Sequence, residues 1–224
     1  MKLPRETPVM TLPNATLFPQ ALLPLYIFEP RYRKMLADAL DSDRMFAVAM
    51  QKPGNLRETP FPVAGLGLIR VAVGHRNGTS HLILQGVARV ELESAVRYKP
   101  YRVHRIRSLG TPPCDSVATD ALLIKVRELV AERIKLGLPF PLPVSPPPST
   151  DATASAFSAG DMMNYLGSIT DPEQAADLVS CAVLPGAAER QAILEAVDVE
   201  TRLRRLIEFL LAEIRKERKG QGRE

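Results

Sequence analysis

Apolar and polar residues alternate over short segments in the first half of the chain, and this spacing predicts β-strands. The predicted strands cover residues 7–12, 22–28, 46–50, 63–73, 82–84, 87–92 and 101–106. Asn77-Gly78 lies between two of these segments, and its residues tolerate the positive φ that a tight hairpin turn requires. Gly86 interrupts the pattern and predicts a bulge or a sharp bend. One helix is expected from Glu29-Pro30 to about Leu40, because proline suits the first helical position.

The second half of the chain changes to helical spacing, with apolar residues three and four positions apart. Asp115 or Ser116 suits the N-cap of the first helix, and Gly137 suits the position just after its end. Proline recurs over residues 139–157, where its fixed φ and missing N–H donor predict a loop. The predicted helices run over residues 115–136, from 161, over 171–184 and over 188–216.

This change of pattern predicts two domains, a β-rich one over residues 1–110 and a helical one over residues 111–219. The predicted fold class is therefore α+β. The net charge of +4 is uneven, because basic residues exceed acidic ones in the first domain and the reverse holds in the second. Different surface charges are consistent with two separate parts.

The overall composition is that of an ordinary globular protein, with 46% hydrophobic and 24% charged residues. No apolar run is long enough to predict a membrane-spanning helix, and the first residues lack the apolar stretch of a secretory signal. Cys114 and Cys181 are isolated and predicted to be reduced thiols. A cytoplasmic location and no contact with a membrane are therefore expected.

Two segments near the start of the chain, Leu12–Pro19 and Leu23–Tyr32, carry a recognisable pattern of apolar residues and prolines. They resemble the start of the N-terminal domain of Lon ATP-dependent proteases, and the Phe-Glu-Pro-Arg-Tyr form looks most like the stand-alone bacterial members of that group. The later similar segments are Gly65-Leu66-Gly67, residues 84–90, Asp171-Pro172 and residues 190–203. Their order and spacing extend the resemblance over nearly the whole chain except the proline-rich loop.

The resemblance implies a PUA-like β pseudo-barrel followed by a helical bundle. It also implies a role in protein quality control, in which the domain recognises unfolded or tagged polypeptide segments and a protease or chaperone is a candidate partner. No Gly-x-x-x-x-Gly-Lys-Ser/Thr loop is present, and no length remains for a peptidase domain. A stand-alone, non-catalytic recognition module without a cofactor is therefore expected. The long last helix leaves a homodimer open.

The preferred binding site is the segment from Leu25 to Tyr32. Its apolar and aromatic side chains are expected to line a groove for client residues, and its charged side chains to orient the client. Strand addition at an exposed sheet edge is a further expected mode. The alternative, left open, is that the apolar residues are core and the two charged residues pair with each other. The proposed contact residues are Leu25, Phe28, Glu29, Arg31 and Tyr32.

The sequence also contains features of other functions. Residues Arg97–Arg107 interleave cations with aromatics, which makes RNA binding through the basic first domain the alternative function. His75 and His81 flank the hairpin turn, but a zinc site needs three or four ligands, so no metal is predicted. No Gly-x-Ser-x-Gly motif is present and Cys181 is expected to be buried and inert, which disfavours the third hypothesis, an enzyme with a cleft between the domains.

Overall fold

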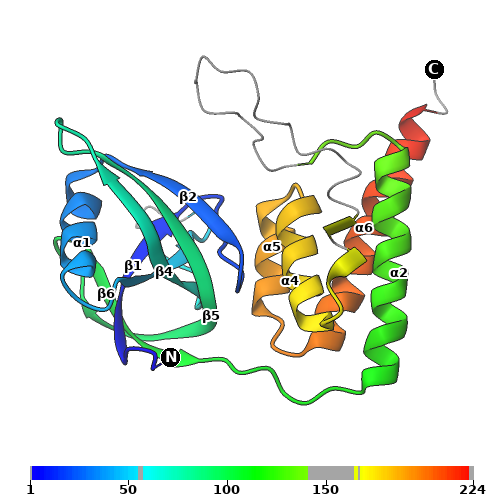
Figure 1. Cartoon of the computed structure of the whole chain (residues 1–224), viewed down its shortest axis with the longest axis horizontal. Coiled ribbons are helices and arrows are strands. Elements are labelled where there is room, and N and C mark those ends of the chain that lie inside the picture. The colour runs from blue at the N-terminus through cyan, green and yellow to red at the C-terminus, as the bar shows by residue number, and fades with distance from the viewer. Residues whose placement is uncertain (1, 55–57, 141–163, 166, 222–224) are drawn as a thin grey trace. The chain divides into compact units, whose positions relative to one another are not determined.

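The computed structural model describes residues 2–54, 58–140, 164–165 and 167–221 (Figure 1). The chain divides into two compact units, Met1–Thr111 and Pro112–Glu224. The described part of the first unit contains β1 (Glu6–Leu12), β2 (Leu22–Ile27), α1 (Pro30–Leu40), β3 (Met45–Met50), β4 (Val63–Gly74), β5 (Ser80–Arg97) and β6 (Arg102–Ser108).

The strands of the first unit form one mixed sheet in the order β2-β5-β4-β3-β1-β6, and β6 also pairs with β5. The first half of β5 pairs with β2 and the second half with β6. Five strands therefore close into a ring of pairings, while β2 stays at an open edge. Figure 1 shows the long strands β4 and β5 crossing the first unit side by side.

Strand β3 is buried along its whole length, as its uninterrupted apolar sequence requires. Side chains alternate between the two faces of a strand. Phe46 and Val48 accordingly join one apolar cluster with α1, whereas Ala47 and Ala49 join a second cluster. The helix contributes a stripe of side chains at helical spacing: Tyr32, Met35, Leu36 and Ala39.

Two glycines let the segment before β2 cross closely over the sheet. A Cβ on Gly65 would lie 1.9 Å from the carbonyl oxygen of Leu17, and one on Gly86 would lie 1.9 Å from that of Phe18. No side-chain carbon tolerates such a distance, so these positions require glycine.

The structure changes one detail of the strand prediction and confirms another. The two segments predicted at residues 82–84 and 87–92 belong to the single strand β5, which continues through Gly86. The predicted irregularity is present as a shift of register where β4 and β5 pair, between Leu66 and Gly67. The hairpin turn is confirmed as well, with Gly78 at a φ of 80°.

The described part of the second unit is helical. Asp115 caps its first helix, as one of the two predicted alternatives, by accepting hydrogen bonds from the N–H groups of Val117 and Ala118. Asp171 caps the next helix through the N–H of Glu173, also as predicted. The helices are α2 (Ser116–Lys135), α4 (Pro172–Val183), α5 (Ala187–Glu195) and α6 (Val199–Gln221).

The single helix predicted over residues 188–216 is wrong, because the chain breaks it into α5 and α6. Ala196 adopts an extended conformation, and Asp198 accepts a hydrogen bond from the Thr201 N–H at 2.7 Å, as an N-cap does. The apolar spacing continues through the break, which is why the hydrophobic pattern alone did not show it. The start of the helix predicted from residue 161 and most of the predicted loop, residues 141–157, lie outside the described residues, while residues 164–165 and 167–168 are helical.

The α+β class, with a β-rich part followed by helices, is confirmed. The sheet of the first unit and its open edge at β2 are the parts of the fold that position the candidate site.

Candidate functional site

An exposed apolar face covers the outer side of β2, β5 and β4. The register places Tyr26 opposite His81 and His81 opposite Val73, and one step further along it places Pro24 opposite Ile83 and Ile83 opposite Val71. These side chains surround a shallow hollow of about 440 Å³. Leu22 and Phe28 extend the same exposed apolar set at the two ends of β2. We call Leu22, Pro24, Tyr26, Phe28, Val71, Val73 and Ile83 the apolar face.

Strand alternation explains why these residues are exposed. Leu82 and Leu84 point from β5 into the core, so Ile83 between them points outward. Tyr26 is 49% exposed and Phe28 is 59% exposed, although both are large apolar side chains. Exposed apolar residues that gather in one place, instead of being scattered, mark interaction sites.

The edge position of β2 leaves one side of the strand without a neighbouring strand in the described sheet. Such an edge offers backbone groups to an added strand. Pro24, in the middle of β2, has no N–H to donate, which weakens pairing at that point. Side-chain contacts to the apolar face are therefore the stronger means of binding here.

Of the five predicted site residues, Phe28 belongs to the apolar face and Leu25 borders it. Phe28 is exposed and its ring stacks on Tyr26, with 5.9 Å between the ring centroids. Leu25 is half-buried and borders the hollow while it also packs against the core. The alternative that Phe28 is simply core is therefore wrong.

Glu29 and Arg31 belong to an ion network instead. The Arg31 Nε donates to Glu29 Oε2 at 2.9 Å, and its two terminal nitrogens donate to the two carboxylate oxygens of Glu58. The hydrogen bonds from Arg31 hold the pKa of Glu58 below its usual value. The predicted pairing of Glu29 with Arg31 is thus present, together with a partner 27 positions along the chain that the sequence did not show.

Tyr32 lies in the core. Its hydroxyl donates to the carbonyl oxygen of Thr11 at 3.2 Å and accepts from the Thr11 N–H at 3.3 Å. Burial raises the pKa of this hydroxyl. The guanidinium of Arg31 lies over the ring at 4.5 Å. Tyr32 therefore fixes α1 to β1 from inside and supports the neighbouring exposed residues.

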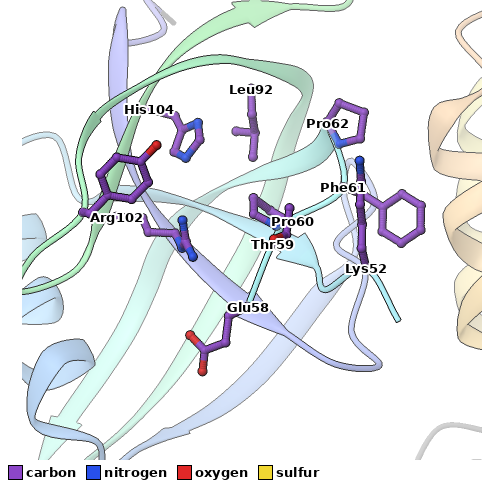
Figure 2. Close-up of a pocket in the computed structure, with 10 residues that line it drawn as sticks. Lys52, Glu58, Thr59, Pro60, Phe61, Pro62, Leu92, Arg102 and His104 are labelled. Atoms are coloured by element: carbon purple, nitrogen blue, oxygen red, sulfur yellow. The ribbon is translucent and has the colours of Figure 1, made fainter. Parts of the chain in front are cut away.

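A second surface feature is a pocket of about 930 Å³ that sequence reasoning missed (Figure 2). Its side chains come from the segment after β3, from β5, from the connection between β5 and β6 and from β6, so no local motif identifies it. The residues that line it are Lys52, Glu58, Thr59, Pro60, Phe61, Pro62, Leu92, Tyr98, Arg102 and His104.

His104 in this pocket is expected to make the first unit less stable in weak acid. Burial, followed by the nearby charge of Arg102, lowers the pKa of the imidazole below its ordinary 6.5. The unfolded chain therefore binds a proton more readily, and stability falls as the pH drops through 6.5 toward the lowered value. When the pH is lowered from 7.5 to 5.5, we expect the unfolding free energy of His104→Phe to fall by less than that of the wild type.

Urea titrations followed by tyrosine fluorescence measure this difference. Phe61→Leu is the matched control, because it changes the lining of the same pocket without removing a titratable group, and it is expected to keep the wild-type pH dependence. Equal pH dependence of His104→Phe and the wild type contradicts the prediction.

The two hairpin histidines approach each other, with 2.7 Å between His75 Nε2 and His81 Nδ1. Tyr26 lies against His81, with 4.7 Å between the ring centroids. Among the described residues, no group of three or more His, Cys, Asp or Glu side chains is arranged to hold a metal ion. The pair therefore adds to the rim of the apolar face.

The basic segment Arg97–Arg107 is largely engaged with other groups. Arg105 pairs with Glu6 at 3.5 Å, and Arg107 pairs with Glu91 and Glu93. Arg97 lies over the ring of Tyr101 at 4.6 Å. These contacts neutralise part of the charge that RNA binding requires. RNA binding thus gains no support from the described geometry.

The comparisons with known proteins decide the family. The family model described as the ATP-dependent protease La (LON) substrate-binding domain matches residues 6–212. The chain belongs to this family. The resemblance read from the sequence segments is thereby confirmed. None of the helices in the described part of the chain is long and apolar enough to cross a membrane.

Curated relatives include the Lon proteases of Desulfosudis oleivorans and Trichlorobacter lovleyi. They are 24% and 26% identical to this Lon-domain chain over 211 and 218 residues, which cover 92% and 95% of it. The matched part is 24% of each relative, so the chain spans about a quarter of their length.

Solved structures share the fold at low sequence identity. The N-terminal domain of the Mycobacterium avium complex Lon protease superposes with a TM-score of 0.69 at 17% identity, covering 92% of this chain and 97% of that one. The Lon N-terminal domain protein from Xanthomonas campestris gives a TM-score of 0.57 at 16% identity, covering 91% and 98%.

Proposed function

We propose that this chain binds polypeptide segments without catalysing a reaction, and that its apolar face contacts the apolar side chains of an unfolded or tagged client. The family match to a substrate-binding domain supports the class of ligand. The observation that carries the site is the apolar face itself, with Tyr26 and Phe28 stacked and exposed beside an open sheet edge.

The physical basis is the burial of apolar surface. An unfolded segment exposes apolar residues that a folded protein hides, and covering them against Tyr26 and Phe28 removes both partners from water. Aromatic side chains contribute large contact areas with little loss of conformational entropy. The expected interaction is modest in strength, tolerant of sequence and only weakly sensitive to salt.

The other predicted residues have supporting roles in this proposal. Leu25 anchors β2 to the core beneath the face, and Tyr32 fixes α1. The network of Arg31 with Glu29 and Glu58 holds the chain just after Phe28 and presents charged groups to the client backbone. Because the curated relatives are Lon proteases, delivery of the client to a cytoplasmic ATP-driven protease is part of the proposal.

Substitution of the two stacked aromatics tests the proposal. Tyr26→Ser and Phe28→Ser together are expected to weaken binding of fluorescein-labelled casein, an unfolded polypeptide, by about tenfold or more, because each removes a large apolar contact. Fluorescence anisotropy measures the affinity. Val96→Ser is the matched control, since Val96 is 50% exposed on β5 but outside the apolar face.

Two outcomes contradict the proposal. One is unchanged casein affinity in a double variant whose urea denaturation curve matches the wild type. The other is absence of casein binding combined with tight binding of a labelled single-stranded RNA that weakens steeply as salt rises.

A further inference from the structure

The pocket in Figure 2 shares no lining residue with the hollow of the apolar face. Its wall combines apolar groups from Phe61, Leu92 and Tyr98 with cations from Lys52 and Arg102. Figure 2 shows the Arg102 guanidinium and the His104 imidazole turned toward the space that Leu92 and Pro60 border. A mainly apolar pocket into which a few polar groups converge is typical of a ligand-binding site.

The cations of this pocket are available to a ligand. The Lys52 ammonium lies over the ring of Phe61 at 5.9 Å, and the Arg102 guanidinium lies over the ring of Tyr98 at 5.5 Å. Within the described part of the chain, neither has a carboxylate at ion-pair distance. Each cation therefore lies beside an aromatic ring, and Arg102 interacts with the Glu58 carboxylate only at longer range than an ion pair.

The one carboxylate in the lining does not cancel this charge. Glu58 is held by two hydrogen bonds from Arg31, and Arg31 also pairs with Glu29. Together with Lys52 and Arg102, this network leaves an excess of one positive charge at the pocket. The local electrostatics thus favour an anionic ligand.

His104 supplies the observation that points to a ligand. Its side chain is buried, with the residue 9% exposed, and among the described residues neither ring nitrogen has a hydrogen-bond partner. A buried polar group left without a partner costs free energy, which a partner group in the pocket recovers. The neutral imidazole has one N–H donor and one acceptor nitrogen, and an acceptor group on a ligand satisfies the N–H.

We propose that this pocket binds a carboxylate joined to an apolar side chain, as presented by the C-terminal residue of a polypeptide. Arg102 and His104 donate to the carboxylate, Lys52 adds positive charge, and Phe61, Leu92 and Tyr98 contact the apolar side chain. The proposal rests on the proposed function only in taking a polypeptide as the source of the carboxylate. It gives the client a second contact, at its chain end, independent of the apolar face.

A pair of peptides that differ at one group tests this. Both carry an N-terminal fluorescein and end in phenylalanine, one with a free carboxylate and the other with an amide. We expect the free acid to bind about tenfold more tightly in fluorescence anisotropy, since a hydrogen bond to a charged group contributes about that factor. Arg102→Gln is expected to remove the difference.

Arg105→Gln is the matched control, because Arg105 lies on the same strand, is exposed, and does not line the pocket. It is expected to keep the preference for the free acid. Equal affinity of acid and amide for the wild type overturns the proposal. If Tyr26→Ser with Phe28→Ser then weakens both peptides alike, the proposed function stands while the pocket assignment fails.

Competition experiments distinguish a site for a carboxylate with an apolar side chain from a general anion site. N-acetylphenylalanine is expected to displace the free-acid peptide, because it carries both the carboxylate and the apolar side chain. Inorganic phosphate at equal ionic strength is not expected to do so. Displacement by phosphate as effective as by N-acetylphenylalanine overturns the assignment, because the pocket then binds anions in general. Binding of N-acetylphenylalanine without binding of the free-acid peptide overturns the assignment to a polypeptide C-terminus, and casein binding at the apolar face is then judged separately.

Discussion

Replacing Arg202 with alanine is expected to lower the unfolding free energy of the second unit by about 3–5 kcal/mol, the usual effect of breaking a buried ion pair. The Arg202 side chain is fully buried and the Asp177 side chain is 1% exposed. The guanidinium donates to Asp177 and to Glu173, each at 3.2 Å, and to the carbonyl oxygens of Ala196 and Val197. The substitution leaves the Asp177 carboxylate buried without this cation.

Urea titration followed by circular dichroism at 222 nm measures the effect, because the second unit is helical. Arg204→Ala is the control, since its side chain is 60% exposed and pairs with Glu200 on the surface. An exposed pair of this kind contributes about 0.5 kcal/mol. Equal unfolding curves for the two variants contradict the assignment of a structural role to Arg202.

Buried arginines close helix ends in the second unit. Arg202 binds the carbonyl oxygens of Ala196 and Val197, just after α5. Arg133 similarly donates to the carbonyl oxygens of Leu138 and Pro139, just after α2, and pairs with Glu213 of α6. The last carbonyl groups of a helix lack intrahelical partners. The buried guanidinium groups of Arg202 and Arg133 donate hydrogen bonds to carbonyl groups just beyond these helix ends. Arg202 thereby stabilises the break between α5 and α6.

For this reason the hydrophobic pattern predicted the presence of the helices better than it predicted where each helix begins and ends. Apolar spacing reports which face of a helix is buried, and that face continues from α5 into α6. The break depends on Arg202, which reads in the sequence as a surface residue of an amphipathic helix. The cap at Asp171 was predicted, and Asp115 was one of two predicted alternatives, because the partners of such caps lie only two or three positions away.

The two candidate sites also differ in whether their residues are close together in the sequence. Leu25 and Phe28 follow one short segment of sequence, and the structure keeps both beside the apolar face. The pocket with Arg102 and His104 also draws on Lys52 and residues 58–62, which reach β5 and β6 only because β4 pairs with β5 and β1 pairs with both β3 and β6. The pairing of β1 with β6 joins strands far apart in the sequence, and the alternation of apolar residues along each strand does not specify which strand is its partner.

The closed sheet makes a second strong prediction, at the glycines that the chain crosses. Gly65→Ala places a carbon atom 1.9 Å from the Leu17 carbonyl oxygen, and this backbone is not the flexible end of a side chain. Relief requires β4 or the segment before β2 to move, which is expected to cost about 3 kcal/mol, at the upper end of overpacking effects. Because that segment leads into β2, casein binding at the apolar face is expected to weaken as well.

Tyrosine fluorescence in urea measures the stability of the first unit, since the chain has no tryptophan and Tyr26, Tyr32, Tyr98 and Tyr101 lie there. Gly74→Ala is the matched control on the same strand, where the nearest atom to an added Cβ is 3.9 Å away. It is expected to stay within about 1 kcal/mol of the wild type. If Gly65→Ala is as stable as Gly74→Ala, the close crossing of Leu17 over β4 does not constrain the fold. A stable Gly65→Ala that loses casein affinity, by contrast, shows that the crossing segment acts on the position of β2 alone.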